Sequence, residues 1–186
     1  MQQDRIRWNQ KYTDETHPKN PSRIVQDFYH LAPPKGRVLD IAAGNGRNAL
    51  FLAKNGFYVD AVDISDAGLY KVSERHKKLN LICADLDNFD IPKDRYSLIV
   101  NCRFLERRLF PLIQEGLASG GLLIFETYLE HFGKKTDEPS RRKHLLKKNE
   151  LLHSFLPLQI LFYQEARESD ENGSEYIASL IGMKND

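Results

Sequence analysis

One stretch of the sequence decides the fold: Val38-Leu39-Asp40-Ile41-Ala42-Ala43-Gly44-Asn45-Gly46-Arg47-Asn48-Ala49. An apolar run typical of a buried strand passes into small residues and two glycines, and a helical pattern begins directly after them. Glycine lets the backbone approach a ligand without a Cβ in the way, and the first turn of a helix carries N–H groups that have no partner within the helix. The sequence therefore predicts a strand, a ligand-binding turn and a helix in succession.

On both sides of this stretch, strand-like and helix-like segments alternate, and no repeat or linker divides the chain. Helices between the early strands indicate parallel crossovers and a sheet covered on both faces. The last two strands are joined by a polar connection without a helical pattern, so they should pair antiparallel. We expect an α/β fold, a doubly wound seven-stranded and mostly parallel sheet with an antiparallel C-terminal hairpin. The predicted strands are Arg37–Ala42, Tyr58–Ile64, Leu79–Ala84, Tyr96–Cys102, Leu122–Tyr128, Gln159–Ala166 and Tyr176–Gly182, and the predicted helices are Pro21–Leu31, Arg47–Asn55, Asp66–Lys77, Glu106–Leu117 and Asn149–Phe155.

The length and composition limit the possible classes of protein. With 186 residues we expect a single domain, 1–186, with an N-terminal cap and helix in 1–35 and a basic loop in 129–148. A formal net charge of +1 provides no global basic field for nucleic acid or for an anionic membrane. No apolar stretch approaches the roughly 18 residues that span a bilayer, and Met1–Gln10 lacks an apolar signal core, so we expect a cytoplasmic protein without membrane contact.

Carboxylates at the ends of the predicted strands narrow the choice of ligand. Asp63 ends the second strand, where a carboxylate in this architecture accepts hydrogen bonds from ribose hydroxyls. Gly44-x-Gly46-x-x-Ala49 also fits a loose dinucleotide fingerprint, so the glycines alone do not choose the nucleotide. Asp40 would repel a pyrophosphate but would attract a sulfonium or ammonium group, by about 4 kcal/mol at about 4 Å and an effective dielectric of about 20. S-adenosylmethionine has such groups, and it is the predicted cofactor.

Each of these residues also has a purely structural interpretation. Asp40 and Asp85 could cap turns, and Asp63 could orient the turn that follows it. Gly44 and Gly46 could serve only the packing of the helix on the strand. Three acidic strand ends on one rim of a sheet nevertheless favour a ligand, with Asp85 as the acceptor for an adenine amino group.

In these segments the sequence resembles the class I S-adenosylmethionine-dependent methyltransferases. The resemblance is carried by Val38–Ala49, Gly56–Ser65 and Ala84–Leu86, and it extends from about Trp8 to the C-terminus. One departure is Ala42-Ala43, which stands where the family often has Gly-Cys or Ala-Cys. Within the superfamily the chain is most similar to the small tellurite-resistance-type methyltransferases, through Arg47–Ala53, Phe104–Leu109, Gly121–Tyr128 and Leu145–Leu151.

The resemblance implies a Rossmann-like methyltransferase fold over the whole domain. It implies that Asp40, Gly44 and Gly46 lie near the methionine moiety, Asp63 on the ribose and Asp85 near the adenine. The predicted cofactor-binding residues are Asp40, Ala42, Gly44, Gly46, Asp63, Ile64, Asp85, Leu86 and Asn101.

The acceptor is expected beyond the fourth and fifth strands, because open α/β sheets bind ligands outside the carboxyl ends of their strands. Asn101 could instead satisfy a loop backbone, Phe104 could belong to the core, and Arg107 could face solvent. Trp8 and Tyr12 could fold over the cofactor mouth or pack against a flank of the sheet. The predicted acceptor-site residues are Trp8, Tyr12, Arg103, Phe104, Arg107, Tyr128 and His131.

Methyl transfer from a sulfonium needs no nucleophilic side chain, because the leaving group is neutral and the enzyme chiefly holds the two reactants together and excludes water. The sequence has no Gly-x-Ser-x-Gly or His-Glu-x-x-His motif, and its six histidines are scattered. We therefore predict no metal site and assign no catalytic residue.

The predicted function is methyl transfer to a small-molecule acceptor, such as a thiol or a chalcogen oxyanion. One alternative is RNA methylation through the basic stretch Lys134–Lys148, which could equally be a solvated loop. Nucleic acid is disfavoured but stays open, since Asn101-Cys102-Arg103-Phe104 lacks the Asn/Asp-Pro-Pro-aromatic motif of enzymes that methylate base amines. The other alternative is a non-catalytic S-adenosylmethionine-binding module. Nothing in the sequence fixes the oligomeric state.

Overall fold

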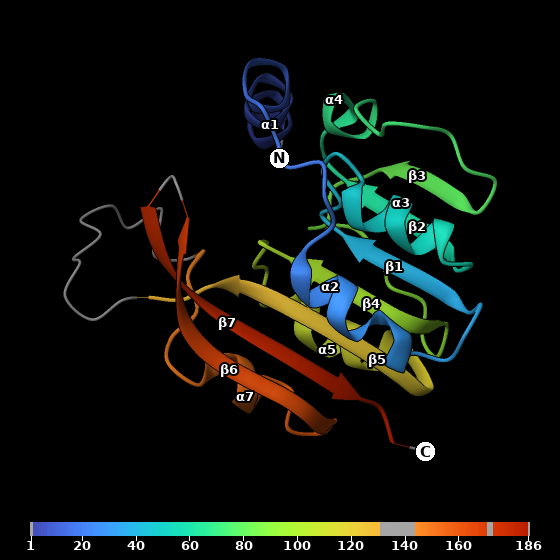
Figure 1. Cartoon of the computed structure of the whole chain (residues 1–186), viewed down its shortest axis with the longest axis vertical. Coiled ribbons are helices and arrows are strands. Elements are labelled where there is room, and N and C mark those ends of the chain that lie inside the picture. Colours follow the sequence, from blue (N-terminus) through green and yellow to red (C-terminus); the bar gives the residue numbers. More distant parts are fainter. Residues whose placement is uncertain (1, 131–143, 171–172, 186) are drawn as a thin grey trace.

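A computed structural model of the chain describes residues 2–130, 144–170 and 173–185. Within these residues one seven-stranded sheet has the strand order β3-β2-β1-β4-β5-β7-β6 (Figure 1). Strands β1 to β5 run parallel to one another, and β7 runs antiparallel to both β5 and β6. The predicted doubly wound sheet with a C-terminal antiparallel hairpin is thereby confirmed. The strands are β1 (Arg37–Ile41), β2 (Tyr58–Asp63), β3 (Leu79–Cys83), β4 (Tyr96–Cys102), β5 (Leu117–Tyr128), β6 (Gln159–Asp170) and β7 (Gly173–Met183).

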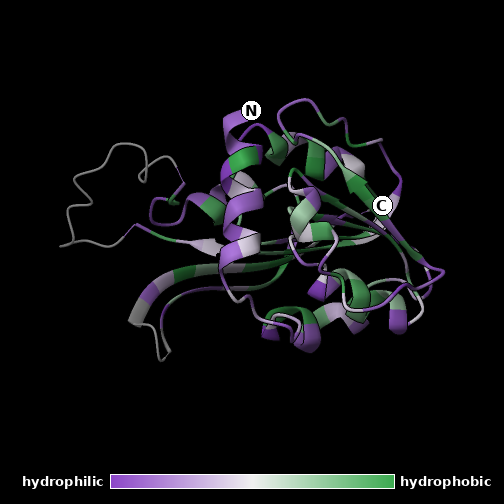
Figure 2. Cartoon of the chain, turned by 90° about the horizontal axis from the view of Figure 1, so that it is seen from above, coloured by the Kyte–Doolittle hydropathy of each residue, from purple (hydrophilic) through white to green (hydrophobic). Residues whose placement is uncertain are grey.

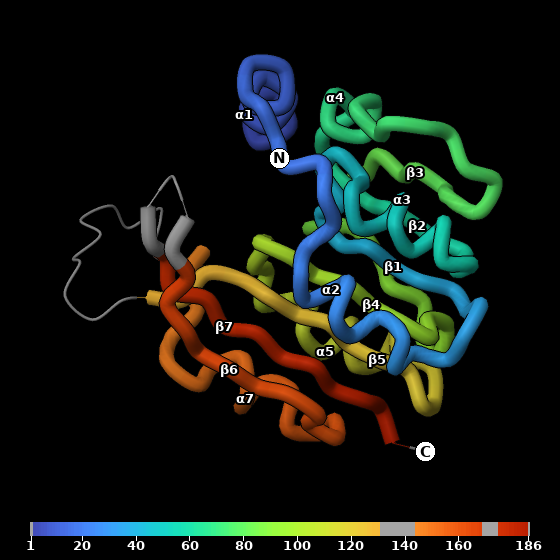
Figure 3. The backbone as a smooth tube through the Cα atoms, in the orientation of Figure 1, coloured from blue at the N-terminus to red at the C-terminus, as the bar shows by residue number. Residues whose placement is uncertain are grey.

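Helices cover both faces of the sheet, as the tube in Figure 3 shows. On one face, α2 and α3 pack against apolar side chains of β1, β4 and β5. On the other face, α5 and α7 bury a cluster that includes the aromatic rings of Phe110, Phe125 and Phe155. None of the described helices is long and apolar enough to cross a membrane. The helices are α1 (Gln2–Asp14), α2 (Arg23–Phe28), the 3-10 turn η1 (Tyr29–Leu31), α3 (Arg47–Lys54), α4 (Asp66–Leu69), α5 (Leu109–Gly116) and α7 (Glu150–Ser154).

The register of the parallel strands places three polar side chains on the face covered by α2 and α3. Residues that pair directly across parallel strands lie on the same face of a sheet. Asp40 pairs with Val100, whose side chain lies in the core under α2 and α3. Cys102, two residues further along β4, packs on that same core and pairs with Glu126. Asp40 and Glu126 therefore share a face near the carboxyl ends of the strands.

The turn between β1 and α3 has the conformation that its small residues predict. Gly44 and Gly46 have φ angles of 58° and 67°, in the left-handed region that glycine adopts without a steric penalty. Ala42 also lies there, with φ of 53°, although it carries a Cβ. The N–H of Gly46 donates to the carbonyl oxygen of Ala43 (2.9 Å) and closes the turn directly before α3.

One predicted helix is too long, and one helix of the structure was not predicted. The helix predicted over Asp66–Lys77 ends at Leu69, and Tyr70 directly after it is 85% exposed. Helix α1 was not among the predicted helices, because none of its residues is buried and Figure 2 colours most of it as hydrophilic. The part of the predicted helix after Leu69 and helix α1 both lack an apolar stripe, which is the pattern that signals a packed helix. Strand β5 also begins at Leu117 rather than at the predicted Leu122.

Candidate active site

Asp40, on β1 just before the glycine turn, holds a buried carboxyl group that is only partly satisfied. The residue is 1% exposed, and no described donor reaches its Oδ2 atom. Burial raises the pKa of Asp40 to about 7, although nearby Arg47 and the backbone N–H of Ala49 act in the opposite direction. No described donor offsets the cost of burying this acceptor, so the oxygen is available to a donor or a cation from a ligand.

Asp63, at the end of β2, links the glycine turn to the turn before α4. Its Oδ2 accepts a hydrogen bond from the backbone N–H of Gly44 (2.7 Å), and its Oδ1 accepts one from the backbone N–H of Ser65 (2.8 Å). Burial raises the pKa of Asp63, and the backbone N–H groups of Ser65, Gly44 and Ile64 oppose that effect. The carboxylate thus orients the turns, which was its structural interpretation. A carboxylate has about four acceptor sites, so three backbone donors leave capacity for a ligand hydroxyl.

Tyr12, on α1, lies directly against the glycine turn. A Cβ added to Gly44 would stand 2.1 Å from the Tyr12 hydroxyl oxygen, and one added to Gly68 would stand 3.0 Å from the ring. Burial raises the pKa of Tyr12 to about 12, and the charges of Asp63 and Asp40 add to the effect. Tyr12 therefore covers the turn where a bound cofactor is expected, and its role as a lid stays a prediction.

Asn9 and Trp8 complete the contact of α1 with the rest of the molecule. The Asn9 amide donates to Asp66 (2.7 Å) and accepts from the Ser65 hydroxyl (2.7 Å), so polar side chains dock α1 beside α4 (Figure 1). The Trp8 ring lies 6.2 Å from the Tyr12 ring, centroid to centroid, with the Lys11 ammonium 5.0 Å from the centre of the Trp8 ring. Trp8 thus lies at the outer edge of the α1 residues that cover the glycine turn.

The residues predicted for the adenine end lie beyond β2 and β3. Asp85 accepts a hydrogen bond from the backbone N–H of Asp87 (3.0 Å), so it caps a turn, which was its structural interpretation. Leu86 is 6% exposed and packs in the core on the α5 face. Ile64 is partly exposed, and its carbonyl oxygen accepts from the thiol of Cys83 (3.6 Å).

Asn101, Phe104 and Arg107 form structural contacts after β4. Asn101 is 2% exposed, and its side-chain amide donates to the carbonyl oxygen of Phe104 (2.8 Å), so it satisfies a loop backbone. Phe104 is partly buried against the core. Arg107 donates to the Glu150 carboxylate (3.0 Å) and to the carbonyl oxygen of Leu145 (2.9 Å), away from the glycine turn. These contacts fix the position of the β4–α5 connection.

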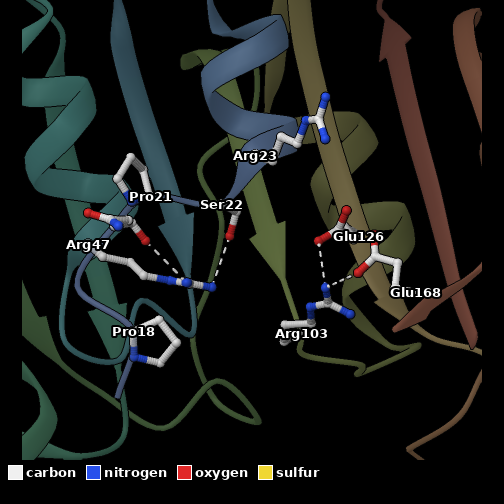
Figure 4. Close-up of a pocket in the computed structure, with 9 residues that line it drawn as sticks. Pro18, Pro21, Ser22, Arg23, Arg47, Arg103, Glu126 and Glu168 are labelled. Carbon is white, nitrogen blue, oxygen red and sulfur yellow. Dashed lines mark hydrogen bonds and ion pairs between the residues drawn. The ribbon is translucent and has the colours of Figure 1, made fainter. Parts of the chain in front are cut away.

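A cavity of about 240 Å³ opens at the carboxyl ends of β4 and β5, close to the N-terminus of α3 (Figure 4). We call it the charged cavity, because arginine and glutamate side chains from several elements surround it. Figure 4 shows Arg47 on one side and the cluster of Arg103, Glu126 and Glu168 on the other. Its lining residues are Pro18, Asn20, Pro21, Ser22, Arg23, Arg47, Arg103, Glu126 and Glu168.

Arg103, a predicted acceptor-site residue, is held between two carboxylates. Its Nη2 atom is 2.8 Å from Glu168 and 3.3 Å from Glu126. The guanidinium also lies over the ring of Tyr128, another predicted acceptor-site residue, at 5.2 Å from the ring centre. Glu126 is 7% exposed, and burial raises its pKa although Arg103 acts against this. The structure thus brings together Arg103 and Tyr128, whereas His131 and residues 134–143 of the predicted basic loop lie outside the described residues.

Several residues of this site were not predicted from the sequence. Glu126 had one available signal, because it is a single carboxylate in the apolar run Leu122–Tyr128. Arg47 was noted only for the family resemblance, and its place at the start of α3 beside a cavity has no sequence signal. Among the described residues no group of three His, Cys, Asp or Glu side chains could hold a metal ion. The residues that were missed are Asn9, Ser22, Arg47, Glu126 and Glu168.

Comparisons with known proteins agree with this fold. TehB from Haemophilus influenzae shares 22% identity at a TM-score of 0.75, over 97% of this chain and 67% of that one. An S-adenosylmethionine-dependent methyltransferase from Mesorhizobium loti shares 18% identity at a TM-score of 0.67, over 86% of this chain and 96% of that one. Phospholethanolamine N-methyltransferase 2 from Haemonchus contortus shares 14% identity at a TM-score of 0.71, over 96% of this chain and 57% of that one. Its structure was solved with phosphomonomethylethanolamine and S-adenosylhomocysteine. At these identities the three structures show a common fold. No curated protein was found to match the chain.

The strand order, the glycine turn and the buried carboxylate beside it define the class of a Rossmann-like methyltransferase. The sequence profile of a family described as a methyltransferase domain matches residues 12–168, and the chain belongs to this family. The predicted enzyme class, an S-adenosylmethionine-dependent methyltransferase, is therefore confirmed, and so is the predicted cofactor.

The raised pKa of Asp40 predicts how the stability of the ligand-free protein depends on pH. An unfolded Asp ionises near pH 4, whereas Asp40 in the fold ionises near pH 7, so the fold is penalised as pH rises through this window. We expect Asp40→Asn to gain stability relative to the parent, by up to about 3 kcal/mol, between pH 5 and pH 8. Urea unfolding at both pH values measures this.

The matched control is Asp27→Asn, which changes an exposed aspartate on α2. This control should follow the parent at both pH values. An identical pH response of Asp40→Asn and Asp27→Asn would contradict the assignment of a raised pKa to Asp40.

Proposed function

We propose that the protein transfers the methyl group of S-adenosylmethionine to a small acceptor whose reacting atom belongs to a thiol or a chalcogen oxyanion. One observation carries the proposal: Arg47 acts electrostatically on both Asp40, beside the glycine turn, and Glu126, in the charged cavity. The Arg47 guanidinium thus lies next to both the expected cofactor turn and the charged cavity, on the same face of the sheet. That arrangement suits a donor and an acceptor held next to each other.

The residues around the glycine turn fit the cofactor. The unpartnered Oδ2 of Asp40 would accept the ammonium or attract the sulfonium. The turn of Gly44 and Gly46 would lie against the methionine part together with Ala42, and the free lone pairs of Asp63 would face the ribose. The cofactor, when bound, supplies a methyl group on a sulfonium whose leaving group is neutral. Ile64, Asp85, Leu86 and Asn101 are proposed around the adenosine.

The chain itself contributes position, exclusion of water and charge. Tyr12 and Trp8 cover the turn and would shield the reacting groups from solvent. Arg47 in the charged cavity would stabilise an anionic group of the acceptor, and nearby cations lower the pKa of a thiol. A thiolate or an oxyanion is already a nucleophile, so no general base is required.

No contact among the described residues favours the alternative of RNA methylation, which rests on residues 134–148, of which only 144–148 are described. The non-catalytic binding module differs from the proposal only in lacking turnover. A cytoplasmic location stays a prediction. Turnover with small acceptors therefore decides among the three functions.

Isotope-labelled S-adenosylmethionine, incubated with small thiols, selenite, tellurite or tRNA, should give labelled product with at least one small acceptor and none with tRNA. Asp40→Asn should lower kcat/KM by at least about tenfold, because the cofactor loses a charged partner, while Asp27→Asn should match the parent. Labelled tRNA would favour the RNA alternative. Cofactor binding without any product would leave the non-catalytic module.

Removal of the proposed lid side chains should weaken cofactor binding. Tyr12→Ala removes a buried wall of the glycine turn, and we expect S-adenosylmethionine to bind about tenfold more weakly; for Trp8→Ala, at the rim, we expect about threefold. Isothermal titration calorimetry measures both. Tyr70→Ala, which removes an 85% exposed tyrosine beside α4, is the control and should leave the affinity unchanged. Parent-like affinity for both lid variants would show that α1 only packs against the flank of the sheet.

A further inference from the structure

The two walls of the charged cavity carry opposite charge. On the α3 wall, Arg47 donates to two neutral oxygens, the carbonyl of Asn20 (3.2 Å) and the hydroxyl of Ser22 (3.0 Å). No described carboxylate forms an ion pair with it. A guanidinium has five N–H donors, so Arg47 retains donors for an anion. This wall is therefore a positively charged subsite.

On the opposite wall, one cation is shared by two carboxylates. Arg103 pairs with both Glu126 and Glu168, so the three groups together carry a net charge of −1 when both acids are ionised. The Ser179 hydroxyl donates to Glu126 (3.2 Å), and the ring of Tyr128 lies under the guanidinium, so the cluster is held in place from several sides. Arg23 also lines the cavity, but its charge is paired with Asp27 (3.4 Å). The wall of Arg103, Glu126 and Glu168 therefore has an excess of negative charge and faces Arg47 across the cavity (Figure 4).

The cavity has room for a small ligand. Its volume of about 240 Å³ accommodates a molecule of the size of an amino acid.

We propose that the charged cavity binds a small zwitterionic acceptor, an α-amino acid or a related molecule that bears both a carboxylate and an ammonium group. The carboxylate pairs with Arg47, and the ammonium pairs with the Glu126 and Glu168 wall. A ligand with only a negative charge meets the excess carboxylate, and one with only a positive charge meets Arg47, so each is disfavoured by one wall. This inference rests on the proposed function, because it names the class of acceptor for that reaction.

The methionine end of the cofactor is itself a zwitterion, so the experiment has to separate the acceptor from the cofactor. We first titrate S-adenosylhomocysteine alone into the protein. With that ligand at saturation, calorimetry then compares four thiols of similar size: L-cysteine, with both charges; 3-mercaptopropionate, with the carboxylate; cysteamine, with the ammonium; and 2-mercaptoethanol, with neither. L-cysteine should bind at least about tenfold more tightly than each of the others.

Two substitutions assign the walls. In Arg47→Gln, the affinity for L-cysteine should fall to the affinity for cysteamine. In Glu168→Gln, it should fall to the affinity for 3-mercaptopropionate. Glu168→Gln should leave the affinity for S-adenosylhomocysteine unchanged. Arg47→Gln should change that affinity less than it changes the affinity for L-cysteine, because Arg47 also acts on Asp40. Arg75→Gln, which changes an exposed arginine in the segment after α4, is the matched control and should bind all four thiols like the parent. Because Arg47 also tethers Asn20 and Ser22, Glu168→Gln keeps the test valid if Arg47→Gln does not fold.

Equal affinity for the four thiols, or tightest binding of 2-mercaptoethanol, overturns the inference and leaves the proposed function standing. A loss of S-adenosylhomocysteine affinity in Arg47→Gln that equals its loss of thiol affinity also overturns it, because the cavity would then hold the cofactor. Failure of S-adenosylhomocysteine to bind the parent protein would overturn the proposed function and, with it, this inference.

Discussion

At the carboxyl end of β1, no described residue donates a hydrogen bond to one oxygen of the buried Asp40 carboxylate, and the neighbouring elements are arranged around it. Asp40 cannot move away from this position, since it belongs to the central strands of the sheet and faces the core under α2 and α3. Burial raises its pKa to about 7, which makes the ligand-free fold less stable when the group is ionised. Such a cost at a strand end is typical of functional sites. A cationic ligand would remove it.

The surrounding residues divide the site into two connected parts. Asp63 holds the glycine turn and the turn before α4 in place, and Tyr12 covers the first of them from α1. On the other side, Arg47 extends from the start of α3 into the charged cavity. Cofactor and acceptor would thus meet at Arg47, whose charge reaches both Asp40 and Glu126. The proposed methyl transfer needs this closeness more than it needs any reactive side chain.

The parts of this account that come from local sequence were predictable, and the parts that come from distant residues were not. The glycine turn was recognised because strand, glycines and helix follow one another directly, and the antiparallel hairpin because no helix separates its strands. Helix α1 escaped notice because polar contacts of Asn9, rather than an apolar stripe, hold it. The charged cavity could not be predicted, since Ser22, Arg47, Glu126 and Glu168 come together only through the sheet order. Asp85 and Asn101 were correctly placed at strand ends, yet their side chains satisfy backbone groups there.

The central claim is that Asp40 provides the negative charge for the cofactor, and the most direct measurement is the number of protons released when S-adenosylmethionine binds. Calorimetric titrations at pH 7 in two buffers of different ionisation enthalpy give that number. Since Asp40 is about half protonated at pH 7 and a cationic ligand lowers its pKa, the account predicts release of about half a proton from the parent and none from Asp40→Asn. Binding of equal strength to both proteins, without proton release from either, would contradict it.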